Sequence, residues 1–213
     1  MKTKCFTVAF VVAVLCCSSA MAVPIAGLFN TGVNPVGNAL VGAGVPDPHY
    51  NVIASPSGAF VPVTVDDTVF PFPPWVPNTP FSRWIGPAAQ FANGPAGFYT
   101  YRTTFNIPSN AILSTVMISG LWGTDDPGND IQINGSPTFQ TSLGFTALAP
   151  FSINSGFVVG LNTLDFLLFN AGGPTGLRVD RIQGKFQVPE PGGIVVAIGG
   201  SALLLLRGRR IMT

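Results

Sequence analysis

The alternating pattern of residues 97–107 most limits what this chain can fold into. The segment reads GFYTYRTTFNI, and aromatic and polar side chains follow one another with a period of two. Successive side chains of a strand point to opposite faces, so this period predicts a β-strand. One face would carry Phe98, Thr100, Arg102 and Thr104, and the other Tyr99, Tyr101, Thr103 and Phe105.

Similar short segments fill the middle of the chain. Residues 112–122 predict a strand buried on both sides, and residues 130–133 run into Asn134-Gly135, the strongest short-range signal for a hairpin. Only 9% of the residues are charged, and 25 Gly and 20 Pro disfavour a helical bundle. We therefore predict a mainly β fold, an antiparallel β-sandwich of the jelly-roll kind. Further strands are expected at residues 50–54, 60–65, 83–85, 147–153, 161–169 and 177–186.

One segment departs from this pattern. Residues 69–80 read VFPFPPWVPNTP and contain five prolines. Proline lacks a backbone N–H and cannot take part in a central strand, so we expect an extended surface loop here.

The C-terminus has three consecutive parts. They are the triplet Pro189-Glu190-Pro191, an uncharged apolar run over residues 192–206, and a basic cluster of Arg207, Arg209 and Arg210. A helix over the apolar run would span roughly 22 Å, short of the hydrocarbon core of about 30 Å, so arginine snorkelling or local thinning must cover the difference. We predict a transmembrane helix with its arginines on the cytoplasmic side.

The N-terminus predicts a secretory signal peptide over residues 1–22. Lys2 and Lys4 precede an apolar stretch over residues 6–15, and Ala20-Met21-Ala22 is a small-residue cleavage site, so the mature chain is expected to begin at Val23. A lipoprotein is the alternative, with Cys16 or Cys17 as the acceptor, but small residues do not precede either cysteine. The three cysteines all lie in this segment, so the mature chain would hold no disulfide or thiolate metal site. Residues 23–188 then form one domain, and residues 189–213 a sorting and anchor segment.

The order of triplet, apolar run and arginine cluster resembles the PEP-CTERM sorting signal of exported bacterial proteins, which an exosortase recognises and processes. The resemblance implies export, anchoring in the inner membrane by the C-terminal helix, and then processing that leaves the protein at the cell surface or outside the cell, within extracellular polysaccharide. A buried terminal helix of a soluble domain is the alternative, but such a helix would rarely end in an arginine cluster.

Seven short fragments, given at the end of this paragraph, carry a second resemblance. Their order and spacing along the chain are similar to those of the galactose-binding-like sandwich domains that often precede PEP-CTERM tails. The resemblance implies the sandwich fold. Domains of the wider family often bind carbohydrate, and many hold a structural calcium, but no ligand-binding motif can be transferred to particular residues. The fragments are DPHY at residues 47–50, SRWI at 82–85, YTYRT at 99–103, ISGLW at 118–122, IQING at 131–135, GLNTLDF at 160–166 and GLRV at 176–179.

The residues offer little for catalysis. His49 is the only histidine, and a structural role for it is favoured over an acid–base role. The carboxylate pairs Asp66-Asp67 and Asp125-Asp126 are sequence neighbours, which on a strand point to opposite faces. We predict that the protein is not an enzyme, with an aspartate-based hydrolase as a remote alternative.

Two binding sites are conceivable. Asp125, Asp126 and Asp130 crowd one predicted turn, where their oxygens could hold a structural calcium; the alternative is that they make hydrogen bonds within the turn. Trp75, with Phe72 nearby, could stack on a sugar ring if its face is exposed, or could instead cover the end of the domain. Trp84 and Trp122 lie in strand-like contexts and are expected in the core.

The charge distribution and the targeting signals at the two ends together favour one function. Between the basic residues at the two ends, the chain has five basic and nine acidic residues, and this negative balance argues against a nucleic-acid-binding surface. We expect an exported, exosortase-processed surface or matrix protein with a non-catalytic domain. The alternative is a carbohydrate-binding module that recognises an extracellular glycan.

Overall fold

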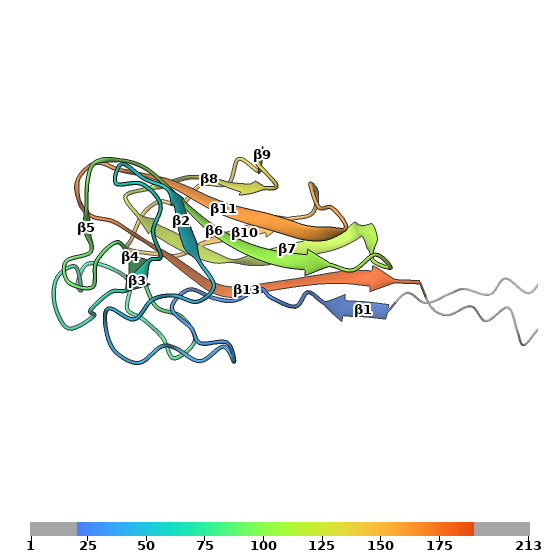
Figure 1. The fold of residues 1–213 in the computed structure, drawn as a ribbon, viewed down its shortest axis with the longest axis horizontal. Coiled ribbons are helices and arrows are strands. Elements are labelled where there is room, and N and C mark those ends of the chain that lie inside the picture. The colour runs from blue at the N-terminus through green and yellow to red at the C-terminus, as the bar shows by residue number, and fades with distance from the viewer. Residues whose placement is uncertain (1–20, 190–213) are drawn as a thin grey trace, which may run out of the picture. The chain divides into compact units, whose positions relative to one another are not determined.

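The computed structural model describes residues 21–189, which form thirteen β-strands and no helix (Figure 1). The larger sheet has the order β10-β7-β13-β4-β3, with β1 paired to β13, and the second sheet has the order β2-β6-β11-β8-β9. A two-stranded ladder joins β12 to β5. All the strand pairs with a resolved register are antiparallel, which confirms the prediction of a mainly β, antiparallel fold.

The strands have the following bounds. In the larger sheet they are β1 (Met21–Pro24), β3 (Val63–Thr64), β4 (Ile85–Gly86), β7 (Ile112–Asp125), β10 (Ala149–Ile153) and β13 (Gly176–Val188). In the second sheet they are β2 (Asn51–Ala54), β6 (Gly97–Ile107), β8 (Gly128–Ile133), β9 (Ser136–Pro137) and β11 (Gly160–Asn170). The small ladder consists of β5 (Asn93–Gly94) and β12 (Gly173–Pro174).

The alternation of residues 97–107 is confirmed in β6. Its odd-numbered residues from Tyr99 to Ile107 are buried, whereas the even-numbered ones are partly or fully exposed. The buried face joins one apolar core to which both sheets contribute, including Phe166 of β11 and Trp122 of β7, whose ring centroids lie 5.7 Å apart. At roughly 25 cal/mol per Å² of apolar surface removed from water, this shared core is the main stabilising contribution to the fold.

The hairpin signal is also confirmed. Asn134 and Gly135 connect β8 to β9 with φ angles of 51° and 78°, and Ile133 pairs with Ser136 across the turn. Two successive positive φ angles are what a two-residue hairpin needs, and Asn and Gly adopt them most readily.

Some predictions at the strand level were wrong. Residues 60–65 contribute only β3, because their backbone bonds go to different segments: Phe60 donates its N–H to the carbonyl of Val52, whereas Thr64 donates to that of Val45. Residues 69–80 form a loop as predicted, but its first part, residues 69–75, is not extended: it forms successive turns, in which Trp75 donates its N–H to the carbonyl of Pro71 at 2.9 Å. Strand β7 continues to Asp125, and only its end from Trp122 onward is buried throughout.

The two ends of the described chain lie side by side. Strand β1 pairs with β13, and Ile25 donates its N–H to the carbonyl of Gly184 at 2.9 Å (Figure 1). Residues Ala22–Val188 form one compact unit. No helix within residues 21–189 is long and apolar enough to cross a membrane. The expected signal helix and transmembrane helix, together with Glu190, Pro191, Arg207, Arg209 and Arg210, lie outside the described residues.

Close packing at one glycine gives a stability prediction. Gly128 is buried where β8 begins, and a Cβ there would overlap the indole of Trp122. We expect Gly128→Ala to lower the free energy of unfolding by about 1–3 kcal/mol, because the indole is fully buried and has no room to move. Urea denaturation followed by tryptophan fluorescence measures this change. The neighbouring exposed residue provides the control: Asn129→Ala should stay within about 0.5 kcal/mol of the parent protein, and equal effects of both variants would refute the packing argument.

Candidate functional site

The turns of residues 69–80 carry the aromatic residues that the sequence proposed for sugar binding. Trp75 is only 2% exposed and packs on Trp84, with ring centroids 4.3 Å apart, in a second small core. Its Nε1 donates a hydrogen bond to Oδ2 of Asp125 at 2.7 Å. Of the two alternatives for Trp75, stacking on a sugar with an exposed face is excluded in this structure, because the ring is buried in the small second core. Trp84 and Trp122 are fully buried, as expected.

Phe72 remains at the edge of a shallow hollow of about 320 Å³. The ring of Phe72 meets Trp75 edge to face, with centroids 5.6 Å apart. The polar residues of its lining are Asp67 and Asn78: Asn78 donates to Asp67 at 2.9 Å, and Arg83 forms an ion pair with Asp67 at 3.4 Å. These polar groups already bind one another, so the hollow offers a small ligand mainly an apolar lining, with the half-buried Phe72 as its one aromatic ring that is not buried.

Asp125, the hydrogen-bond partner of Trp75, is 6% exposed. Burial raises the pKa of its carboxyl to about 7, against the opposing effect of the Trp75 N–H, and the neighbouring charge of Asp126 raises it further. Its backbone carbonyl accepts a hydrogen bond from the hydroxyl of Thr175 at 2.8 Å. Asp125 thus connects β7 to the turns of residues 69–80 and to the segment before β13.

The proposed calcium ligands do not come together. Asp126 accepts from the N–H of Ala171 at 2.7 Å, and Asp130 accepts from that of Thr138 at 3.3 Å. Asp125 is engaged by Trp75. Over residues 21–189 no group of three or more His, Cys, Asp or Glu side chains is placed to hold a metal ion. The carboxyls of Asp125 and Asp126 interact with each other, but Asp130 does not complete a group of three with them, so the three residues do not assemble the donor set that calcium requires.

His49 is held by packing and by its backbone. Its ring stacks on Phe29, with centroids 3.7 Å apart and an angle of 7° between the planes. The carboxylate of Asp47 accepts from the N–H groups of His49, Tyr50 and Gly32 at 2.7, 3.0 and 2.6 Å. Burial raises the pKa of Asp47, while these three donors oppose the rise. The DPHY fragment thus fastens the N-terminal segment to the start of β2.

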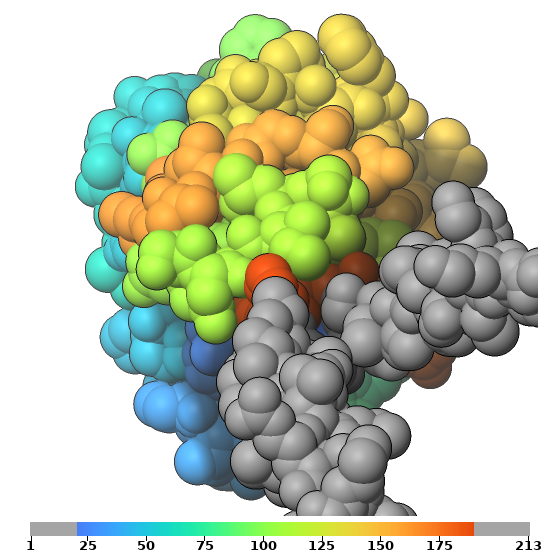
Figure 2. Space-filling model, turned by 90° about the vertical axis from the view of Figure 1, so that its right-hand side faces the viewer, coloured from blue at the N-terminus to red at the C-terminus, as the bar shows by residue number. Residues whose placement is uncertain are grey.

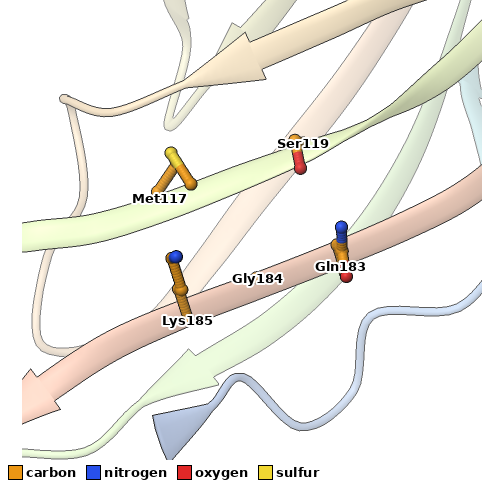
Figure 3. A pocket seen from close by; sticks show the side chains of 5 residues that line it. All are labelled: Met117, Ser119, Gln183, Gly184 and Lys185. Carbon is orange, nitrogen blue, oxygen red and sulfur yellow. The ribbon is translucent and has the colours of Figure 1, made fainter. Parts of the chain in front are cut away.

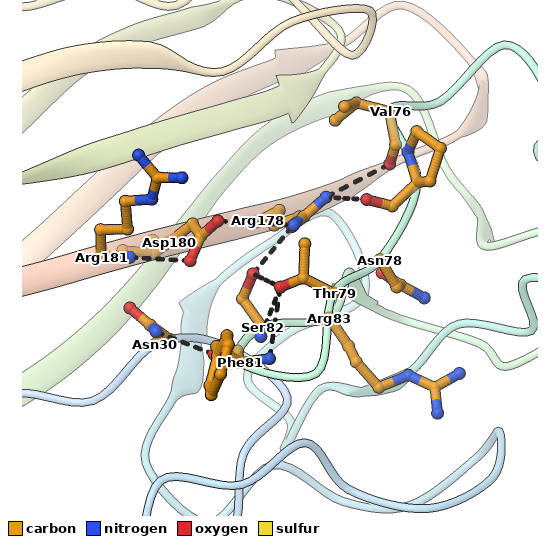
Figure 4. Close-up of polar contacts among 12 residues, drawn as sticks. Asn30, Val76, Asn78, Thr79, Phe81, Ser82, Arg83, Arg178, Asp180 and Arg181 are labelled. Carbon is orange, nitrogen blue, oxygen red and sulfur yellow. Dashed lines mark hydrogen bonds and ion pairs between the residues drawn. The ribbon is translucent and has the colours of Figure 1, made fainter.

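A buried arginine, which the sequence analysis missed, lies near these turns (Figure 4). Arg178 of β13 is 1% exposed, and its Nε donates to the hydroxyl of Ser82 at 3.0 Å. One terminal nitrogen binds the carbonyls of Val76 and Pro77, and the other lies 3.5 Å from the carboxylate of Asp180. No local pattern predicts this cluster, because its members are far apart in the sequence.

Two of the other concave regions formed by the described residues differ greatly in size. A hollow of about 120 Å³ lies between β7 and β13, where Met117 and Ser119 face Gln183 and Lys185 (Figure 3). This is smaller than the range of about 300–1,000 Å³ that is usual for small-molecule sites. A groove of about 530 Å³ lies beside β9 and β10. Apart from Ile133, its residues belong to none of the seven sequence fragments above, although Phe139 is the one aromatic residue in SPTFQTS.

No protein-family model matches this chain, and no curated protein matches it. The two family resemblances therefore stay predictions from the sequence fragments that carry them.

Proposed function

We propose that the chain is an exported, non-catalytic β-sandwich protein of the jelly-roll kind, which its C-terminal helix holds in the inner membrane until an exosortase-type enzyme processes it. The processed domain would then reside at the cell surface or in extracellular polysaccharide. One observation carries the proposal: β13 ends at Val188, directly before Pro189-Glu190-Pro191.

The position of this boundary supports processing without loss of the fold. The compact unit spans Ala22–Val188, so a cut within residues 189–191 leaves intact every strand that the structure describes. Signal cleavage after Ala22 would leave residues 23–24 of β1, and the bond from Ile25 to Gly184 would still fasten the new N-terminus to β13. Both processing steps therefore fall at the margins of the folded unit.

The use of the carboxylates supports a non-catalytic role. Asp165 forms two hydrogen bonds with Arg102, both 2.7 Å long, in a fork geometry that fixes β11 against β6. Asp47 is saturated by backbone N–H groups, and Asp125 is bound to Trp75. These side chains connect segments of the fold rather than converge on one open cleft.

The intact mass of the protein, recovered from native cells and from their surroundings, tests the proposal. We expect a species outside the inner membrane that begins at Val23 and ends close to residues 189–191. A species that keeps residues 207–213 and stays in the membrane fraction would show that the tail is a permanent anchor, and the processing proposal would fail.

A carbohydrate-binding module is the second candidate. The groove beside β9 and β10 favours it, because this groove combines an exposed aromatic ring with polar side chains.

A further inference from the structure

The groove lies where the edges of the two sheets meet. Strand β9 is the edge of the second sheet, and β10 is the edge of the larger one. Figure 2 shows the yellow segment that contains β8 and β9 along the upper margin of the molecule. The groove measures about 530 Å³, within the range of about 300–1,000 Å³ that is usual for ligand sites. Its lining comprises Ile133, Ser136, Pro137, Thr138, Phe139, Gln140, Ser152, Ile153, Asn154, Ser155 and Gly156.

Side-chain hydrogen bonds hold its two walls together. Gln140 donates to the hydroxyl of Thr138 at 3.1 Å, and its carbonyl oxygen accepts from the N–H of Ser152 in β10 at 2.7 Å. The side chain of Asn134 donates to the carbonyl of Gly156 at 2.9 Å and so connects the hairpin turn to the opposite wall. These bonds give the groove a defined shape before any ligand arrives, which lowers the entropic cost of binding.

Phe139 is the unusual residue of the groove. Its side chain is 84% exposed, and its backbone has a φ angle of 60°, in the left-handed region that a bulky residue rarely adopts. Neither burial nor backbone preference explains a phenylalanine here, where glycine or asparagine would fit with less strain. Strain held at an exposed position without compensation from packing points to a functional role.

The remaining lining residues indicate the chemistry of the ligand. Six of them carry a hydroxyl or an amide group, the others are apolar or glycine, and no charged residue is among them. The six are Ser136, Thr138, Gln140, Ser152, Asn154 and Ser155. A carboxylated or phosphorylated ligand would give up water without gaining a cationic partner, and this loss of hydration is costly. A ligand with an apolar face and many neutral hydroxyl groups fits better.

We propose that this groove binds a neutral glycan, with the Phe139 ring against the C–H face of one sugar unit. Ser136, Asn154 and Ser155 lie on the exposed rim and supply hydrogen bonds to its hydroxyl groups. This proposal rests on the proposed function, because an exported domain would encounter extracellular glycans. It places the sugar-binding position at Phe139 rather than at Trp75 and Phe72.

Binding is tested with the full chain in a detergent that has no sugar headgroup. Calorimetry is performed with neutral and acidic oligosaccharides of matched length. We expect saturable binding of neutral glycans, at least about tenfold weaker in Phe139→Gly and retained in Phe139→Tyr, because the tyrosine keeps the ring. The midpoint temperature of unfolding should be unchanged or higher in Phe139→Gly, because glycine removes the backbone strain. A lower midpoint would instead assign Phe139 a structural role.

Two further variants separate this groove from other surfaces. Ser155→Arg fills the groove with a bulky charge and should abolish binding with Phe139 intact. Phe98→Ala removes another exposed ring, on β6, and should leave binding unchanged. Any of four results would overturn the proposal. They are glycan binding that survives both groove variants, a preference for acidic glycans, no binding of any glycan, and selective binding of extended peptides. Because processing is measured in cells and binding on purified protein, the two proposals can fail separately.

Discussion

Arg178→Met is expected to lower the free energy of unfolding by about 3–5 kcal/mol, which would be a large fraction of the stability of a domain this size. The guanidinium is 1% exposed and binds the hydroxyl of Ser82, the carbonyls of Val76 and Pro77, and the carboxylate of Asp180. Methionine keeps much of the volume but removes the cation beside the buried Asp180 carboxylate and the donor to the carbonyl of Pro77. The Val76 carbonyl keeps the Trp84 indole N–H and Asp180 keeps the Arg181 N–H, so the loss comes from the uncompensated carboxylate charge and from the unpaired Pro77 carbonyl.

The effect of Arg178→Met is measured by urea denaturation with tryptophan fluorescence, since Trp75 and Trp84 lie in the small core next to this cluster. Arg181→Met is the matched control on the same strand, because Arg181 is exposed and only its backbone N–H bonds Asp180. The control should change stability by less than about 0.5 kcal/mol. If both variants lose the same small amount, Arg178 does not connect β13 to residues 76–82 as described.

Stability is expected to fall as the pH rises from about 4 to about 7, through the carboxyl of Asp125. Its pKa is about 7 in the folded chain against an ordinary value of 3.8. In this window the unfolded chain has released the proton that the folded chain still holds, so each rise in pH favours unfolding. A shift of about three pKa units corresponds to a loss of the order of 2–4 kcal/mol, complete above about pH 7. The raised pKa of Asp47 acts in the same direction.

The measurement is a series of urea denaturation curves between pH 4 and pH 8. Asp125→Asn should flatten most of the dependence, because its amide oxygen can still accept the Trp75 N–H at every pH. Asp66→Asn is the control, since the half-buried Asp66 uses its carboxylate only to bond Thr68. These bonds lower the pKa of Asp66, so its own effect on stability lies below about pH 4. A parent protein whose stability rises between pH 4 and pH 7, or an Asp125→Asn variant with an unchanged slope, would contradict the assignment.

The candidate site shows where reasoning from sequence stops. The aspartates at residues 125, 126 and 130 are close in sequence, but each accepts from a different partner, and Trp75 is oriented by Asp125, which is 50 positions away. Proximity along a chain brings oxygens near one another without pointing them at a common centre. The Phe139 groove was missed for a related reason, since β9 and β10 belong to different sheets and only the folded chain brings them together.

The sequence by itself determined the parts of the fold that depend on local geometry. The alternation of β6 follows from the period of a strand, and the β8–β9 turn follows from the ease with which Asn134 and Gly135 adopt positive φ angles. Only the tertiary structure decided the order of strands in each sheet and the burial of Trp75 and Arg178. Arg178 meets Ser82 across 96 positions, and a contact at that distance depends on how the intervening strands are arranged rather than on any pattern near either residue. A charged side chain in a strand can be buried only where distant segments supply its partners, and those partners exist only once the chain has folded.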